Sequence, residues 1–383
     1  MALHFERAEY ADRQRQACAA LQAGGLDGLL MFRQESMYWL TGYDTFGFCF
    51  FQCLYLSQDG RIVLLTRAPD LRQARNTSVI EDIRIWVDRD GASPADDLKD
   101  MLDGLGARGH RLGVEYDAYG LNARNGKRLD AALDGFATLL DISELISTLR
   151  LIKSPAELAY VHRAAELADD ALRAAHALTG PGADEGDILA AMQGAVFRGG
   201  GDYAGNEFII GSGPDALLCR YFSGRRVLDA RDQLTLEFAG AYRHYHACLM
   251  RTIPIGPVSD HQRHMFDACV EALAACKLAL RPGRPIGEVF DAHARVMDAH
   301  GLRHARLNAC GYSLGAVFAP IWMDYPMFYH GNPVEAAPDM VFFLHMILMD
   351  SEAGQAMTLG ETVIVTDGAP ERLSAMPLEL VAK

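Results

Sequence analysis

The sequence has no hydrophobic run long enough to cross a bilayer and no cluster of basic residues. Its longest apolar stretches fall far short of the roughly 20 residues that a membrane helix needs. The 36 Lys and Arg are outnumbered by 50 Asp and Glu, and the resulting net charge of −14 disfavours a nucleic-acid-binding surface. Residues 1–16 carry both signs of charge, which is not typical of a signal peptide. We therefore expect a cytoplasmic protein without nucleic-acid or membrane partners.

Paired cysteine motifs are missing as well. The eight cysteines include no CxxC pair. A chain of 383 residues, half of them hydrophobic, buries a large core without the help of disulfides. We expect mostly reduced thiols, in a protein of two or three domains.

The first part of the chain alternates helix-like and strand-like segments. An amphipathic helix is predicted over residues 7–23, where Gly24-Gly25 ends it. Asp59-Gly60 predicts a turn between two strands. The remaining predicted elements are a helix over 94–106 and strands over 28–32, 46–56, 62–65 and 112–115. This order predicts a small α/β domain over residues 1–147.

The character of the sequence changes near residue 150. Ser154 and Glu157 form a capping-box pattern, and Pro155 occupies the first helical position. A long helix is predicted from there to about residue 178, and residues 146–153 are the predicted linker. The second domain is therefore expected over residues 148–383.

This second part contains an internal repeat. Residues 181–189 (PGADEGDIL) are matched 101 positions later by residues 282–290 (PGRPIGEVF), and each copy lies between two helix-like segments. Strand-like runs follow the copies, over 207–211 and 234–255, then over 307–314, 340–349 and 357–366. The pattern predicts a duplicated α+β unit about a pseudo-twofold axis, with an antiparallel sheet backed by helices.

Several local sequences resemble the creatinase/aminopeptidase P family, whose catalytic domain has the pita-bread fold. They are residues 37–43 (MYWLTGY), 150–154 (RLIKS), 210–216 (IGSGPDA) and Arg251-Thr252. The resemblance covers essentially the whole chain. It implies an α+β protein in which a small N-terminal creatinase-type α/β domain precedes a pita-bread domain with an internal pseudo-twofold repeat.

The metallopeptidase branch of that family binds two metal ions through two Asp, one His and two Glu. The resemblance places other residues at these positions: Glu237, Cys248, Tyr312, His345 and Gly360. Because bridging carboxylates hold two divalent ions together and one carboxylate remains, we expect no metal and no other cofactor. One alternative stays open, a single zinc site made from Glu237, His246, Cys248 and His345.

Further segments are similar to the ectoine hydrolases, which are metal-free members of this fold. They are residues 237–247 (EFAGAYRHYHA), 200–203 (GGDY), 310–312 (CGY) and 48–54, with Gln52-Cys53. The chain departs from that branch at Arg220, where the branch keeps a histidine, and only loosely matches it over residues 319–322. The resemblance implies hydrolysis of a non-peptide C–N bond in a small zwitterionic molecule. Ectoine, a cyclic amidine, is the best candidate.

The candidate catalytic residues are Glu237, His246, Tyr312 and His345. Apolar neighbours predict that Glu237 is buried, and the resemblance implies that it is the nucleophile, although a general base is the other possibility. His246 is predicted to share a strand face with His244 and to transfer protons. Tyr312 and His345 either face the substrate or fill the core.

The candidate substrate-binding residues include two arginines, since guanidinium groups bind carboxylates in a bidentate manner. The predicted set is Arg220, Arg251, His244, Asp202, Tyr203, Tyr245 and Trp322.

Three aromatic residues have two possible roles. Trp39, Phe48 and Phe50 either pack in the core or, as the resemblance implies, reach the pocket of the neighbouring subunit in a homodimer.

Three other functions stay open: a creatinase-like amidinohydrolase, an Xaa-Pro peptidase relative with a rebuilt metal site, and an inactive binding module. Convergence of the polar side chains in one closed pocket would favour an enzyme over the binding module.

Overall fold

A computed structural model describes residues 3–220 and 224–383. The chain divides into two compact units, residues 1–150 and 151–383, three residues beyond the predicted boundary. Helix α6 (Leu145–Leu149) occupies the first part of the predicted linker, and its Ile146 is fully buried. The prediction of a linker is wrong there because Ile146 packs into the core of the first unit.

The first unit contains a mixed six-stranded sheet in the order β4-β3-β2-β1-β5-β6. Its strands are β1 (Gly28–Met31), β2 (Cys53–Ser57), β3 (Ile62–Arg67), β4 (Asp82–Trp86), β5 (Arg111–Val114) and β6 (Thr138–Asp141). Its other helices are α1 (Arg7–Ala23), α2 (Gln34–Thr41), α3 (Ala68–Thr77), α4 (Pro94–Gly104) and α5 (Ala123–Leu133). The predicted α/β character is confirmed.

The predicted strand over 46–56 is largely wrong. Residues 47–49 form a short 3-10 helix, and strand β2 begins at Cys53. Asp70 accepts a hydrogen bond from the Thr45 hydroxyl at 2.6 Å and lies so close that a Cβ on Gly47 would be 2.3 Å from its Oδ1. The chain therefore turns here instead of extending.

Trp39, Phe48 and Phe50, for which two roles were possible, differ in how far they are buried. Trp39 and Phe48 are buried in the first unit. Phe50 is half exposed, and the guanidinium carbon of Arg67 lies 4.1 Å from its ring centre. Packing in the core therefore accounts for Trp39 and Phe48 and not for Phe50.

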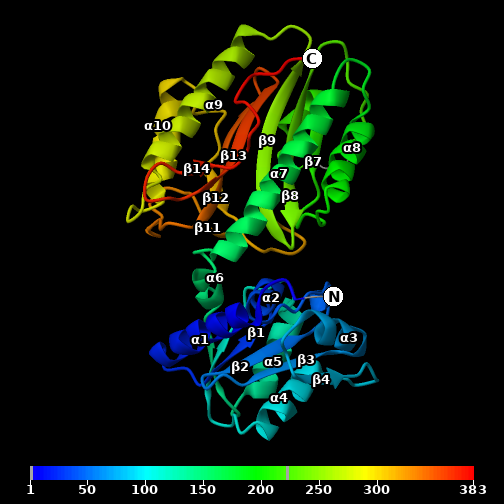
Figure 1. Ribbon diagram of the computed structural model, residues 1–383, viewed down its shortest axis with the longest axis vertical. Helices are drawn as coiled ribbons and strands as arrows, with labels where there is room; N and C mark the ends of the chain where they lie inside the picture. Colours follow the sequence, from blue (N-terminus) through cyan, green and yellow to red (C-terminus); the bar gives the residue numbers. More distant parts are fainter. Residues whose placement is uncertain (1–2, 221–223) are drawn as a thin grey trace. The chain divides into compact units, whose positions relative to one another are not determined.

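The second unit is an eight-stranded sheet with helices on one face (Figure 1). The strand order is β11-β10-β12-β13-β9-β8-β7, and β14 pairs with β13. The helices are α7 (Pro155–Leu178), α8 (Glu185–Arg198), α9 (Asp260–Ala279) and α10 (Gly287–Ala299). The strands are β7 (Ile209–Ser212), β8 (Asp232–Tyr242), β9 (Tyr245–Ile255), β10 (Gly311–Ser313), β11 (Asp324–Met327), β12 (Val341–Asp350), β13 (Gln355–Ile364) and β14 (Glu371–Arg372).

The two halves of this unit repeat one another. Each half has a helix pair followed by strands, with α7 over β8 and β9, and α9 over β12 and β13 (Figure 1). Strands β9 and β13 pair at the centre. The predicted duplication and the pita-bread fold class are confirmed.

The strand registers place one row of residues on the face away from the helices. Ile209, Glu237, Met250, Gly360 and His345 are successive direct partners across β7, β8, β9, β13 and β12. The alternate positions of β12, such as Leu344 and Met346, pack with α9 in the core. Because side chains alternate along a strand, the row that contains Glu237 and His345 points to the open face.

A two-residue turn sets this arrangement. Tyr242 pairs with Tyr245, and the turn residues Arg243 and His244 both have positive φ, 48° and 65°. The turn makes Ala241 the partner of His246 and Ala239 the partner of Cys248, so both share the face of Glu237. The prediction that His244 and His246 share a strand face is wrong, because His244 belongs to the turn.

Two further findings concern helices and cysteines. Among the described residues, no helix combines the length and apolarity needed to span a bilayer. None of the eight cysteines is paired in a disulfide.

Gly240 lets helix α7 approach the sheet closely. A Cβ at this position would lie 2.0 Å from the carbonyl oxygen of Ala164 and 2.6 Å from the nitrogen of Ala168. Both are backbone atoms of α7, which do not move aside as a flexible side chain would. The small residues Ala164, Ala165 and Ala247 pack around the same contact.

We predict that Gly240→Ala lowers the free energy of unfolding by about 3 kcal/mol, because the added methyl group overpacks the helix–sheet contact. Gly194→Ala is the control in the same unit, since its Cβ would meet only the end of the flexible Arg198 side chain. It should stabilise helix α8 by about 0.5–1 kcal/mol. Urea unfolding followed by circular dichroism measures both, and equal effects would contradict the prediction.

Candidate active site

A cavity of about 170 Å³ opens on the face of the sheet away from the helices. Its wall combines a few polar groups with many apolar side chains. The lining residues are Asn206, Ile209, Cys219, Arg220, Glu237, Leu307, Ala309, Tyr312, Ile321, Trp322, Met323, Met327, His345 and Ile347. Small-molecule sites have this composition, with apolar walls and a few placed polar groups.

Glu237 is the carboxylate of this cavity. It lies in β8, is 8% exposed and accepts a hydrogen bond from the Tyr312 hydroxyl at 3.1 Å. The indole Nε1 of Trp322 donates in turn to the Tyr312 oxygen at 2.8 Å. The three side chains therefore form one chain of hydrogen bonds that ends on the carboxylate.

Burial raises the pKa of Glu237 to about 7, against the smaller opposing effects of the Tyr312 hydrogen bond and the Arg220 charge. The carboxyl group is thus divided between its two protonation states near neutral pH. A nearby cation would favour the ionised form. Burial also raises the pKa of the Tyr312 hydroxyl well above its usual value, so this group stays protonated as a donor.

His345 lies in β12 and is a further titratable group of the cavity that sequence analysis named. Burial lowers the pKa of its imidazole to about 3, so the ring is neutral. Its ring centre lies 5.6 Å from that of Tyr312. Its Nδ1 atom is sealed from solvent and finds no hydrogen-bond partner among the described residues.

The residues at the family's metal positions do not fit a dinuclear metal site. Gly360 offers no ligand, and a Cβ there would lie 2.5 Å from the Phe343 ring, which fills the space. Burial raises the pKa of the Cys248 thiol well above its usual value, which keeps it protonated. Within residues 3–220 and 224–383, no three His, Cys, Asp or Glu side chains are grouped so that they could hold a metal ion.

The alternative of a single zinc site also lacks a ligand. His246 accepts a hydrogen bond at Nε2 from the Gly205 N–H at 2.8 Å, and its Nδ1 donates to the His244 carbonyl at 2.7 Å. Both ring nitrogens are therefore occupied, and neither offers a lone pair to a metal.

The same contacts place His246 outside the cavity wall, as a residue that joins two loops. The prediction that it transfers protons to substrate does not agree with this position.

His244 stacks on Phe318 with 4.1 Å between ring centres, and its backbone N–H donates to Asp202 Oδ2 at 3.3 Å. His244 and Asp202 therefore support the β8–β9 turn and lie away from the cavity.

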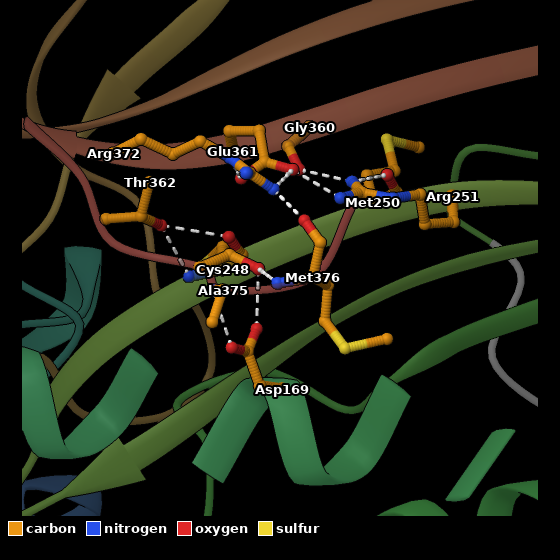
Figure 2. A network of polar contacts seen from close by, with 11 residues as sticks. Asp169, Cys248, Met250, Arg251, Gly360, Glu361, Thr362, Arg372, Ala375 and Met376 are labelled. Atoms are coloured by element: carbon orange, nitrogen blue, oxygen red, sulfur yellow. Dashed lines mark hydrogen bonds and ion pairs between the residues drawn. The ribbon is translucent and has the colours of Figure 1, made fainter. Parts of the chain in front are cut away.

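Two predicted substrate-binding residues point to the helix face of the sheet. Tyr245 donates its hydroxyl to Glu157 of α7 at 2.6 Å. Arg251 pairs with the buried Glu361 and donates to the Gly360 carbonyl at 2.8 Å, and Arg372 binds the other side of Glu361 (Figure 2). Arg251 therefore does not face the cavity, because Leu236, its partner in β8, lies on the face opposite Glu237.

Tyr203 is also separate from the cavity. It is 82% exposed and packs edge-on against Phe197 at 4.8 Å. The residue of that segment that does reach the cavity is Asn206.

Five predicted residues converge on the one cavity: Glu237, Tyr312, His345, Arg220 and Trp322. Their chemical roles stay predictions. Sequence analysis missed most of the apolar wall, although one of its members had a signal. Ile347 follows His345 by two positions on β12, whereas Ile209 is placed beside Glu237 only by the strand register of the structure.

Sequence models of known families match both units. The model of metallopeptidase family M24 matches residues 159–367, and that of the creatinase/prolidase N-terminal domain matches residues 13–152. The chain belongs to metallopeptidase family M24. The expected family is therefore confirmed, and with it a hydrolase framework.

Individual relatives extend over the whole chain. An uncharacterized hydrolase/peptidase of Sinorhizobium fredii is 28% identical over 393 residues, which cover 100% of this chain and 99% of the relative. An ectoine hydrolase of Halomonas elongata is 26% identical over 403 residues, which cover 100% and 99%.

The fold also matches solved structures. An Xaa-Pro dipeptidase from Bacillus anthracis superposes with a TM-score of 0.85 at 20% identity, covering 98% of this chain and 100% of that one. At this identity the likeness shows the fold alone. The chain is therefore similar in fold to an Xaa-Pro dipeptidase and in sequence to an ectoine hydrolase, and these likenesses do not choose between the two activities.

We predict that Glu237→Gln becomes stabilising relative to the wild type as the pH rises. The folded protein keeps the Glu237 proton up to about pH 7, whereas the unfolded chain releases it near 4.5, so stability present at low pH is lost as the pH rises through 7. The difference should reach the order of 3 kcal/mol by pH 9. Thermal unfolding of both proteins between pH 5 and 9 measures it. Glu207→Gln, on an exposed side chain, should show no such trend.

Proposed function

We propose that the chain hydrolyses a non-peptide C–N bond in a small zwitterionic molecule without a metal ion, and that ectoine is the first candidate substrate. The observation that carries the proposal is one buried carboxylate, Glu237, which faces a small cavity and holds a hydrogen bond from Tyr312. Arg220 on the same wall supplies the opposite charge.

The size and charges of the cavity support this class of substrate. A protein cavity of about 150 Å³ binds benzene, so about 170 Å³ accommodates one six-membered ring with small substituents. Glu237 suits a cationic amidine, and the Arg220 guanidinium suits a carboxylate. The apolar side chains that make up most of the wall suit the carbon skeleton between these groups.

The pKa of Glu237 supports a role as nucleophile. With its pKa near 7, the carboxyl group is ready to ionise when a cationic amidine binds beside it. The carboxylate oxygen then attacks the amidine carbon, and the ring C–N bond breaks as the departing nitrogen takes a proton from water. This leaves an imidoyl group, which keeps its C=N bond, on the Glu237 oxygen. The hydroxide from that water adds to the imidoyl carbon and the Glu237 carboxylate leaves, which gives the amide of the product, so that one difficult step is divided into two.

The comparisons support the same choice among M24 enzymes. The Halomonas elongata ectoine hydrolase aligns over the whole chain. Peptidase chemistry with two metal ions is less compatible with Gly360 and Tyr312 at the ligand positions that the resemblance indicates.

A cytoplasmic homodimer is part of the proposal. Phe46 and Phe50 remain 80% and 49% exposed on the first unit, and a partner subunit would remove them from water.

We predict that the purified protein opens the ectoine ring in the presence of excess chelator, and that Glu237→Gln abolishes turnover. Proton NMR of the reaction mixture measures the conversion to acetylated diaminobutyrate. Turnover that appears only after zinc or manganese is added would contradict metal independence. A wild-type protein that is inactive under both conditions would remove ectoine as the substrate.

We predict that Tyr312→Phe lowers kcat about 100-fold, because a donor to the reacting carboxylate is lost from a buried site. Tyr245→Phe is a matched control, since that hydroxyl also donates to a buried glutamate, Glu157, but on the helix face. Each substitution should cost about 1–2 kcal/mol of stability. Steady-state kinetics that show equal losses would contradict a specific role for Tyr312.

A further inference from the structure

The two halves of the sheet in the second unit meet at a short seam between β9 and β13. Among the described residues, these strands pair directly at two positions, Arg251–Leu359 and Met250–Gly360. By contrast, β8 pairs with β9 along the whole of β8, and β12 pairs with β13 along the whole of β12. The seam is therefore the least extensively paired part of the sheet that carries the cavity.

The hydrogen bond between Tyr312 and Glu237 crosses this seam. Glu237 lies in β8, in the half that contains β9, and Tyr312 lies in β10, which pairs with β12 in the other half. The contact of 3.1 Å therefore joins groups that are held by opposite halves of the sheet. It is already longer than the roughly 2.7–2.8 Å typical of O–H···O bonds, so a small widening of the seam would weaken it.

A threonine side chain takes the place of a backbone pair where the seam continues. Two positions beyond the Met250–Gly360 pair, the register brings Thr362 opposite Cys248. The Thr362 hydroxyl accepts a hydrogen bond from the Cys248 N–H at 2.8 Å and donates to the Cys248 carbonyl at 2.9 Å (Figure 2). Both residues are buried, so this one hydroxyl satisfies two backbone groups that water does not reach.

The same threonine is in register with Tyr312. Thr362 pairs with Phe343 in β12, and Phe343 pairs with Tyr312 in β10. The rings of Phe343 and Tyr312 also pack against one another with 5.5 Å between their centres. The position of the Tyr312 hydroxyl therefore depends on how Thr362 is held against β9.

The directly paired part of the seam has a separate brace. Nη1 of Arg251 donates to the carbonyls of Met250 and Gly360, each at 2.8 Å, and so bridges the two strands (Figure 2). Loss of the Thr362 hydroxyl should therefore leave this pair closed and release only the part of β13 that follows it.

We propose that Thr362 is a positioning residue, whose hydroxyl closes the seam and so holds the Tyr312 hydroxyl within hydrogen-bonding distance of Glu237. A valine in its place would have nearly the same shape, but it would leave the N–H and the carbonyl of Cys248 without partners in the core. This part of β13 then moves away from β9 or admits water, and Tyr312 moves with it. The consequence for catalysis rests on the proposed function, whereas the positioning itself does not.

The indole N–H of Trp322 reports on the Tyr312 hydroxyl without any substrate. It donates to that oxygen at 2.8 Å, and a hydroxyl oxygen that itself donates to a carboxyl group is the stronger acceptor. The chain has three tryptophans, so ¹H–¹⁵N spectra contain three indole signals, and Trp322→Phe identifies this one. Glu237→Leu gives the position of the signal when Tyr312 has lost its acceptor.

Thr362→Val should move the Trp322 signal upfield, toward its position in Glu237→Leu, and should cause no further movement in a Glu237→Leu background. Thr362→Ser, which keeps the hydroxyl, should retain the wild-type position. An unmoved Trp322 signal in folded Thr362→Val would overturn the proposal. If Thr362→Val does not fold, Thr362→Ala, which removes the hydroxyl without adding an apolar group, carries the same expectation.

Thr358→Val is the matched control on the same strand. The Thr358 hydroxyl also bonds across the seam, to the Thr252 hydroxyl at 3.0 Å, but it lies four residues from Thr362 and serves no backbone group of β9. Each valine substitution should lower the melting temperature by about 2–8 °C. Thr358→Val should leave the Trp322 signal in place. Equal movement in both variants would indicate a general loosening of the sheet and would also overturn the proposal.

Turnover separates the positioning from its use. With ectoine, Thr362→Val should lower kcat about tenfold with KM changed less than about twofold, and Thr362→Ser should recover most of the loss. In a Tyr312→Phe background, Thr362→Val should cause little further loss. If the wild type does not hydrolyse ectoine, the proposed function fails and the Trp322 measurement still decides the positioning. A wild-type kcat in a Thr362→Val protein whose Trp322 signal has moved would remove the catalytic role.

Discussion

The register of four adjacent strands is the constraint on which the site depends. The two-residue turn at Arg243 and His244 fixes how β8 pairs with β9, and the central pairing of β9 with β13 extends that register to β12. Glu237 and His345, more than 100 positions apart in the chain, therefore stand in one row on the open face. A shift of one residue at the turn would move every side chain of β9 to the opposite face.

Each face of this sheet carries a buried glutamate, and the two glutamates have different partners. On the helix face, Glu361 is enclosed by Arg251 and Arg372, which balance its charge and leave it structural (Figure 2). On the open face, Glu237 accepts a hydrogen bond from the Tyr312 hydroxyl and has Arg220 at the cavity wall. Burial raises its pKa to about 7, because these two partners offset the effect of burial only in part. The helix-face glutamate is hydrogen-bonded to two arginines. The open-face glutamate is left to respond to whatever cation enters the cavity.

The site also indicates how one framework serves different reactions. The M24 fold supplies a row of inward positions on a rigid sheet, and in this chain those positions carry a carboxylate, a phenol and an imidazole instead of a set of metal ligands. Tyr312 donates to Glu237 and accepts from Trp322, so these three polar groups satisfy one another. The buried Nδ1 of His345 finds no hydrogen-bond partner among the described residues.

The sequence by itself determined the two-domain division, the duplicated unit and the long capped helix α7. These follow from local signals, such as the Ser154–Glu157 capping box and the spacing of the repeat, which act over a few residues or recur at a fixed distance. The shared site of Glu237, Tyr312 and His345 was implied by the resemblance to family motifs. Tertiary structure decided which face each strand residue occupies. Arg251, Tyr245 and His246 could not be placed from strand alternation alone, because the turn geometry between β8 and β9 sets the parity. The apolar wall of the cavity comes from separate segments that meet only when the second unit folds, and no pattern along the chain records that meeting.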